Sequence, residues 1–131
     1  MRTIHLAVVL AVGSATAHAP LPTQQPDITR TPLQRRDLAV PGREVIQVRV
    51  DIRPGVTFGK HTHPGDEIVY VIEGRLTYEV DGRAPVTLGA GEVLFIPAGT
   101  VHTAKSVGRG NGGELATYIV EKGKPLVVLA Q

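Results

Sequence analysis

The sequence predicts an all-β fold, either a barrel or a sandwich, built from short strands that recur at regular intervals. Runs rich in β-branched residues alternate with turn residues, about every eight to twelve positions. The chain of 131 residues contains 15 Gly and 10 Pro, which fall mostly between these runs. No segment shows helical periodicity of useful length. The pattern therefore favours a sheet protein with many turns over a helical bundle.

The predicted strands end at recognisable turn residues. Residues 44–53 alternate between apolar and polar side chains, which indicates a strand with one buried face. Turns follow at Pro54-Gly55, at Pro64-Gly65 and at Asp81-Gly82, the last being a strong hairpin signal. The predicted strands are residues 44–53, 56–63, 67–72, 75–80, 85–88, 93–96, 101–106, 114–120 and 126–129.

Length and composition limit the classes of function. A chain of 131 residues has room for one domain. Its 14 Lys and Arg nearly balance 12 Asp and Glu, and only Arg35-Arg36 stand adjacent, so no nucleic-acid partner is expected. The absence of Cys excludes disulfides, thiolate metal sites and cysteine nucleophiles.

The first residues have the pattern of a secretory signal peptide. A positive start is followed by an apolar run from Ile4 to Val12 and then by small residues up to Ala19. We expect residues 1–17 to be removed by cleavage after Ala17, because the alternative cut after Ala19 would place Pro20 directly behind it. The apolar run is too short to span a membrane. This predicts a periplasmic or secreted protein without membrane insertion.

A proline-rich stretch follows the predicted signal peptide. Residues 18–43 contain five prolines separated by polar residues, which is typical of an extended arm or linker. From Glu44 onward, apolar and polar residues alternate in place of the proline-rich composition, so the sequence predicts a barrel domain over residues 44–131.

Three histidines and a glutamate stand beside predicted strands. His61 and His63 are two positions apart on an extended segment, so both side chains leave the same face of the sheet. Pro64-Gly65 then returns Glu67 at the start of the next strand, and a rolled sheet can bring His102 opposite. Three imidazoles and one carboxylate suit Fe, Mn, Ni, Co, Cu or Zn, with one or two coordination positions left open.

Fixed residues around these side chains favour a metal site over a polar surface face. The first pattern is Gly55-x5-His61-x-His63-x3-Glu67-x6-Gly74, and the second is Gly91-x5-Pro97-x-Gly99-x2-His102. They resemble the two motifs of the cupin superfamily, G-x5-H-x-H-x(3,4)-E-x6-G and G-x5-P-x-G-x2-H-x3-N. The one departure is Ser106 in place of the final Asn. We expect the glycines to occupy turns that need positive φ or a close backbone approach.

The resemblance implies a double-stranded β-helix, or jelly-roll barrel, with an extended N-terminal arm. It also implies that His61, His63, Glu67 and His102 bind one divalent transition-metal ion inside the barrel. Ser106 is not at a ligand position of the family. The 16 residues between Gly74 and Gly91 are similar in length to those of small single-domain microbial cupins. Cupins usually cover their sheet edges by pairing, so a homodimer is expected.

Weaker candidates lie around the predicted site. Counting by two along their strands places Tyr78 and Tyr118 on faces that belong either to the core or to a pocket. A buried tyrosine with a satisfied hydroxyl is the favoured interpretation over a catalytic role. Gln47 or Arg49 is a candidate for anchoring a substrate, although an outward Arg on a strand is more common.

Two functions are consistent with such a site. The first is a metal-dependent enzyme that acts on a small oxygenated molecule by dioxygenation, decarboxylation or isomerisation. The ligand set resembles that of quercetinase-like dioxygenases, and Glu67 could act as both ligand and base. The second is a non-catalytic periplasmic module that binds a small ligand or a metal. The fold alone does not choose between them.

Overall fold

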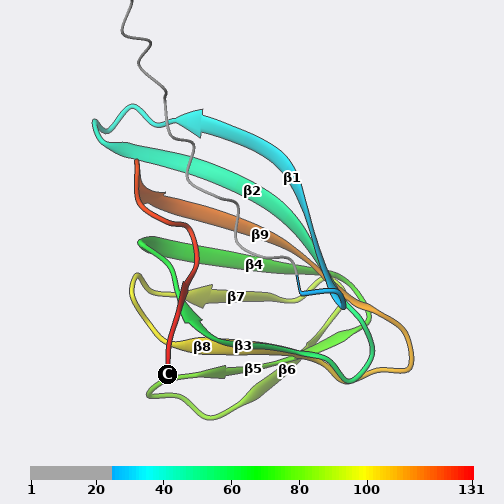
Figure 1. Ribbon diagram of the computed structural model, residues 1–131. Helices are drawn as coiled ribbons and strands as arrows, with labels where there is room; N and C mark the ends of the chain where they lie inside the picture. The colour runs from blue at the N-terminus through cyan, green and yellow to red at the C-terminus, as the bar shows by residue number, and fades with distance from the viewer. Residues whose placement is uncertain (1–24) are drawn as a thin grey trace, which may run out of the picture.

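The computed structural model describes residues 25–131 as two five-stranded antiparallel sheets packed face to face (Figure 1). The strand order is β1-β2-β9-β4-β7 in the first sheet and β10-β3-β8-β5-β6 in the second. Strands distant in sequence lie side by side, as in a jelly roll, which confirms the predicted all-β fold. The strands are β1 Ile28–Asp37, β2 Arg43–Ile52, β3 Thr57–Thr62, β4 Gly65–Glu73, β5 Arg75–Val80, β6 Val86–Gly89, β7 Val93–Ile96, β8 His102–Ser106, β9 Gly112–Glu121 and β10 Val128–Leu129.

Within residues 25–131 there is no helix, and hence none able to cross a membrane. The predicted signal peptide of residues 1–17 lies outside the described residues. The nine predicted strands correspond to β2 through β10.

One strand start differs from the prediction for a physical reason. The strand expected to begin at residue 114 begins earlier, because Gly112 and Gly113 already pair with β2 as part of β9. A Cβ at Gly112 would lie 2.4 Å from Cδ2 of Leu76, so any larger residue here would displace the Leu76 side chain of the opposite sheet. The glycine-rich composition therefore permits a close approach of the sheets, in addition to a turn.

The structure corrects the predicted start of the barrel. Residues 28–37, which were assigned to an arm or linker, form β1 and pair antiparallel with β2 along its whole length. Proline is compatible with this position because β1 is an edge strand and its register shifts between Pro32 and Gln34. Ile28 is buried in the core. The barrel therefore begins at β1 and not at residue 44.

Strand alternation determines which side chains fill the barrel. On β4, Val69 and Val71 are fully buried, whereas Tyr70 between them is 46% exposed. Tyr78 on β5 of the opposite sheet and Tyr118 on the neighbouring β9 are the largest fully buried side chains. Alternate residues of these strands thus point into the barrel and away from it, as strand geometry requires. The inner faces of the two sheets form one apolar cluster, and the buried histidines and glutamates lie among its residues.

Gly74 shows why the first motif ends in glycine. It lies between β4 and β5, where the chain leaves the first sheet for the second, with φ of 69°. A Cβ on this residue would lie 2.2 Å from the carbonyl oxygen of Asn111. Both the left-handed backbone and the close contact exclude a side chain.

We expect Gly74→Ala to lower the free energy of unfolding by at least about 2 kcal/mol, because it adds φ strain and a backbone clash. Gly108→Ala is the control, since Gly108 has open space around its Cβ position. Urea unfolding followed by circular dichroism measures both variants. Equal stability of the two variants would show that the close approach at Gly74 does not constrain the fold.

Candidate metal centre

Three strands bring the predicted ligands together inside the barrel. His61 ends the inward series of β3, Glu67 lies on β4 and His102 begins β8. The register pairs His61 directly with His102 across β3 and β8. His63 follows β3 at the point where Pro64 carries the chain to the opposite sheet. All four side chains are buried, with at most 4% of their surface exposed.

Each imidazole is oriented by a backbone carbonyl. Nδ1 of His61 lies 2.8 Å from the oxygen of Gly59, and Nδ1 of His102 lies 2.9 Å from that of Thr100. Nδ1 of His63 lies 2.6 Å from the oxygen of Leu126. A carbonyl oxygen only accepts hydrogen bonds, so each Nδ1 donates and each Nε2 of a neutral ring carries a lone pair. This is the arrangement in which histidine binds a metal through Nε2.

The three lone pairs converge, and these histidines could hold a metal ion. One ring nitrogen from each of the three lies within 4.8 Å of the others. Oε2 of Glu67 lies 3.3 Å from Nε2 of His63 and 3.1 Å from Nε2 of His102. These three atoms are buried and, among the described residues, have no hydrogen-bond partner of good geometry.

The distances fit a shared cation. Two ligand atoms about 2.1 Å from one ion, at angles of 90–110°, lie roughly 3.0–3.4 Å apart. Lone pairs of Nε2 and a carboxylate oxygen repel each other at this separation unless a proton or a metal ion lies between them. The donor set of imidazole nitrogen and carboxylate oxygen suits a divalent transition metal. The residues present therefore fit the ion that the sequence predicted.

Electrostatics in the metal-free protein are consistent with this interpretation. Burial and the neighbouring His102 lower the pKa of His61 to about 3, so this ring is neutral. Burial lowers the pKa of His102, but the close contact with the Glu67 carboxylate outweighs burial and raises it. Burial would raise the pKa of Glu67, yet His102 and His63 hold it well below its usual range. Glu67 thus stays ionised and attracts a positive charge.

A second polar pair lies beside the histidines, and only its tyrosine was a candidate from the sequence. The hydroxyl of Tyr78 on β5 donates to Oε2 of Glu114 on β9, and both residues are buried. Burial, with repulsion from Glu67, raises the pKa of Glu114 to about 7. Burial raises the pKa of Tyr78. Only the alternation along β9, which turns residue 114 inward with Tyr118, could have identified this glutamate.

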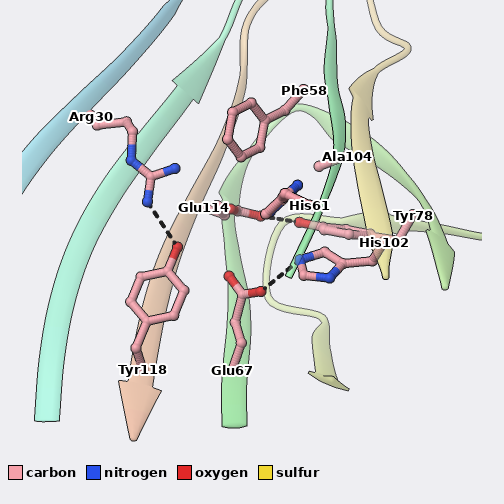
Figure 2. A pocket seen from close by; sticks show the side chains of 9 residues that line it. All are labelled: Arg30, Phe58, His61, Glu67, Tyr78, His102, Ala104, Glu114 and Tyr118. Atoms are coloured by element: carbon pink, nitrogen blue, oxygen red, sulfur yellow. Dashed lines mark hydrogen bonds and ion pairs between the residues drawn. The ribbon is translucent and has the colours of Figure 1, made fainter. Parts of the chain in front are cut away.

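These groups line one small cavity (Figure 2). The free volume is about 10 Å³, which is close to what one water molecule needs. Its lining residues on β1 and β3, Arg30 and Phe58, are only half-buried, so the cavity meets solvent between them. The lining residues are Arg30, Phe58, His61, Glu67, Tyr78, His102, Ala104, Glu114 and Tyr118.

Whether each weaker candidate reaches the cavity depends on the face of the strand from which its side chain extends. Gln47 faces outward and bonds to Thr117, and Arg49 faces outward and pairs with Asp51, so neither reaches the cavity. The prediction that either anchors a substrate there is wrong, because the even-numbered residues of β2 point inward. Tyr78 and Tyr118 are buried with bonded hydroxyls, as favoured from the sequence, but both also line the cavity.

Comparisons with known proteins agree with this architecture. The cupin domain family (Cupin_2) matches residues 48–116. Polyketide synthase CurC from Streptomyces cyaneus is 41% identical over 58 residues, which cover 44% of this chain and 37% of that protein. In the curated relatives matched, the aligned segments span 27–41% of the length of each protein.

Solved structures share the fold. A protein with a double-stranded β-helix domain from Klebsiella pneumoniae superposes with a TM-score of 0.67 at 20% identity and covers 85% of this chain and 90% of that one. An oxalate oxidase in complex with the substrate analogue glycolate gives a TM-score of 0.65 at 26% identity. That match covers 82% of this chain and 57% of the oxidase chain.

The raised pKa of Glu114 predicts a pH dependence of stability in the metal-free protein. The folded state binds this proton more tightly than the unfolded chain, whose ordinary pKa is 4.5. The protonated Glu114 carboxyl therefore stabilises the folded state fully below pH 4.5, and this stabilisation is lost as the pH rises through about 7. Glu114→Gln should remove this loss, which is on the order of 3 kcal/mol.

Urea unfolding of chelator-treated protein at pH 4.5 and pH 8 measures this effect. The difference in unfolding free energy between Glu114→Gln and the unsubstituted protein should grow with pH. Glu79→Gln, at an exposed position of β5, is the control and should stay within about 0.5 kcal/mol at both values. A constant difference for Glu114→Gln would contradict the prediction.

Proposed function

The chain belongs to the cupin domain family, and from this premise we propose that it binds one divalent transition-metal ion through His61, His63, Glu67 and His102. The observation that carries the proposal is the orientation of the imidazoles, because a carbonyl oxygen engages every Nδ1 and leaves every Nε2 with a lone pair, while ring nitrogens of the three histidines lie within 4.8 Å of one another. Fe, Mn, Ni, Co, Cu and Zn are all compatible with these ligands.

We further propose that the protein is a metal-dependent enzyme for a small oxygenated organic molecule. A bound ion would supply Lewis-acid polarisation of an oxygen donor and, if redox-active, electron transfer to O2. The similarity to an oxalate oxidase supports an enzymatic role. Dioxygenation is the first reaction to test, and decarboxylation and isomerisation are the alternatives.

The chain itself offers two routes for a proton. Glu67 lies against both His63 and His102, and a carboxylate that shifts from an ion can accept a proton from a substrate. The Tyr78–Glu114 pair lies on the same cavity, and the pKa of Glu114, raised to about 7 mainly by burial, is near that of an effective acid or base. Burial of these groups excludes bulk water from the transfer.

The size of the cavity favours a second candidate function. A free volume of about 10 Å³ accommodates a water molecule but no bulky substrate without movement. A non-catalytic module that binds a metal or a very small ligand is consistent with this volume. The two functions differ in whether any substrate is turned over.

The setting of the protein is part of the proposal. The apolar run and small residues before Ala17 support export to the periplasm or outside the cell, with no membrane insertion after cleavage. N-terminal sequencing of the chain recovered from the producing cell and its medium tests this, and an intact Met1 would contradict it.

A homodimer is the proposed assembly. Apolar side chains lie exposed on the outer face of β4 and on the edge strand β7, among them Ile68, Tyr70 and Phe95. An exposed patch of this kind is typical of a surface that another chain covers. Analytical ultracentrifugation of the purified chain decides between one and two copies.

We expect the purified protein to bind one metal ion per chain, and His61→Ala and Glu67→Gln to weaken binding by at least tenfold. The reason is that each substitution removes one donor from a pre-oriented set. Elemental analysis identifies the ion, and titration calorimetry gives the affinity. Glu73→Gln is the matched control, because Glu73 lies on the same strand but is exposed.

Activity is then tested by oxygen uptake with a flavonol, a catechol and a 1,3-diketone. Uptake that His61→Ala abolishes supports the dioxygenase, and tight ligand binding without turnover supports the binding module. Unchanged metal affinity in the His61 and Glu67 variants would overturn the proposed centre. Chelation that unfolds the barrel, with neither turnover nor ligand binding, would indicate a purely structural ion.

A further inference from the structure

Arg30 is the one arginine or lysine among the described residues that line the cavity. It lies on β1 opposite Val50, and Figure 2 shows its guanidinium extending from the strand toward Tyr118. Because β1 was expected to be a linker, no sequence signal placed an arginine beside the cavity. Arg30 is half-buried, so its charge stands at the mouth of the cavity and not in bulk solvent.

Among the described residues, no ion pair matches the charge of Arg30. Within residues 25–131, no carboxylate lies within 4.0 Å of its guanidinium nitrogens. The nearby carboxyl of Glu114 instead accepts a hydrogen bond from Tyr78. Other arginines of this sheet and its flank do pair: Arg35 with Glu44, Arg49 with Asp51 and Glu73, and Arg53 with Asp27. A half-buried guanidinium without a carboxylate is suited to receive one from a ligand.

Two aromatic residues hold the guanidinium in place. One Nη2 donates to the hydroxyl of Tyr118 at 3.2 Å, and the guanidinium carbon lies 5.5 Å from the ring centre of Phe58. These contacts occupy one donor and one face, which leaves further N–H groups for a ligand. Tyr118 accepts from Arg30, so its own hydroxyl proton is free to be donated. The ring of Tyr118 packs 4.6 Å from that of His63, which links Arg30 to the proposed metal centre.

The charges of the cavity favour an anionic ligand. The two carboxyl groups are Glu67, which faces the histidines, and Glu114, which Tyr78 bonds. A divalent ion held by neutral imidazoles and Glu67, together with Arg30, leaves a net positive charge even when Glu114 is ionised. An anion restores neutrality in a site of low dielectric constant, where the gain is larger than in water.

We propose that Arg30 and the hydroxyl of Tyr118 bind the carboxylate of a small hydroxy acid or oxo acid whose other oxygen faces the histidine cluster. This assignment of a substrate class rests on the proposed metal-dependent function. The free volume of about 10 Å³ is close to that of one water molecule, so the ligand must be a short-chain acid, and the half-buried side chains of Arg30 and Phe58 must move to admit it. Specificity then comes from a fork of N–H donors that matches two carboxylate oxygens, which an amide or an alcohol cannot reproduce.

The test compares the smallest hydroxy acid, glycolate, with its uncharged amide, glycolamide. Titration calorimetry or ligand-observed NMR on the metal-loaded full chain gives both dissociation constants. Glycolate should bind at least tenfold more tightly than glycolamide, and Arg30→Gln should remove this preference by weakening glycolate alone. Arg30→Lys should retain part of it, because the charge remains and the fork is lost. Arg36→Gln, an exposed position on the same strand, is the control and should change nothing.

The outcomes separate this inference from the metal proposal. Equal binding of acid and amide, or a preference that survives in a folded Arg30→Gln variant, overturns the role of Arg30. If Arg30→Gln does not fold, Tyr118→Phe decides, since loss of the donated hydroxyl should still weaken glycolate more than glycolamide. Repeating the titrations after chelation keeps the readings independent, because the Arg30-dependent preference for the acid should persist without the ion. Absence of metal binding would contradict the proposed centre and leave this preference measurable.

Discussion

The interior of the barrel depends on three backbone carbonyls that each accept a hydrogen bond from a histidine Nδ1. Since the carbonyls of Gly59, Leu126 and Thr100 cannot donate, they select the tautomer whose Nε2 lone pair faces inward. Two of the carbonyls lie two residues before the histidine that they orient, and the third comes from the segment before β10. The ring orientation is thus a property of backbone and register, which pre-organises the ligands before any ion arrives.

This arrangement buries several polar groups together, where each compensates the charge or the hydrogen-bonding capacity of its neighbours. Glu67 stays ionised because His63 and His102 face it, and Glu114 is buried with the hydroxyl of Tyr78 as its partner. An uncompensated buried charge is costly, so each group constrains the protonation of its neighbours. The same coupling makes a cation at the centre favourable and gives the cavity a proton acceptor that is not itself a histidine.

The edge strand β1 connects the fold to the chemistry. As an edge strand it tolerates Pro32 and the register shift behind it, and its first residues cover the core through Ile28. The next inward position brings Arg30 to the mouth of the cavity, against Tyr118 and Phe58. An element that contributes little to the apolar core therefore supplies the one arginine of the described cavity lining.

By itself the sequence predicted the all-β class, most strand limits and the candidate ligands, because strand periodicity, turn residues and the glycine-framed motifs are local signals. It did not identify Glu114 or Arg30, because neither residue belongs to a sequence motif. Their roles follow only from the side chains that the fold places around them. Register decided that Glu114 lies opposite Val71 and that His61 pairs with His102. Tertiary structure likewise made residues 28–37 a strand, since pairing with β2 outweighs a proline-rich composition. Those outcomes depend on long-range contacts, which no window of neighbouring residues contains.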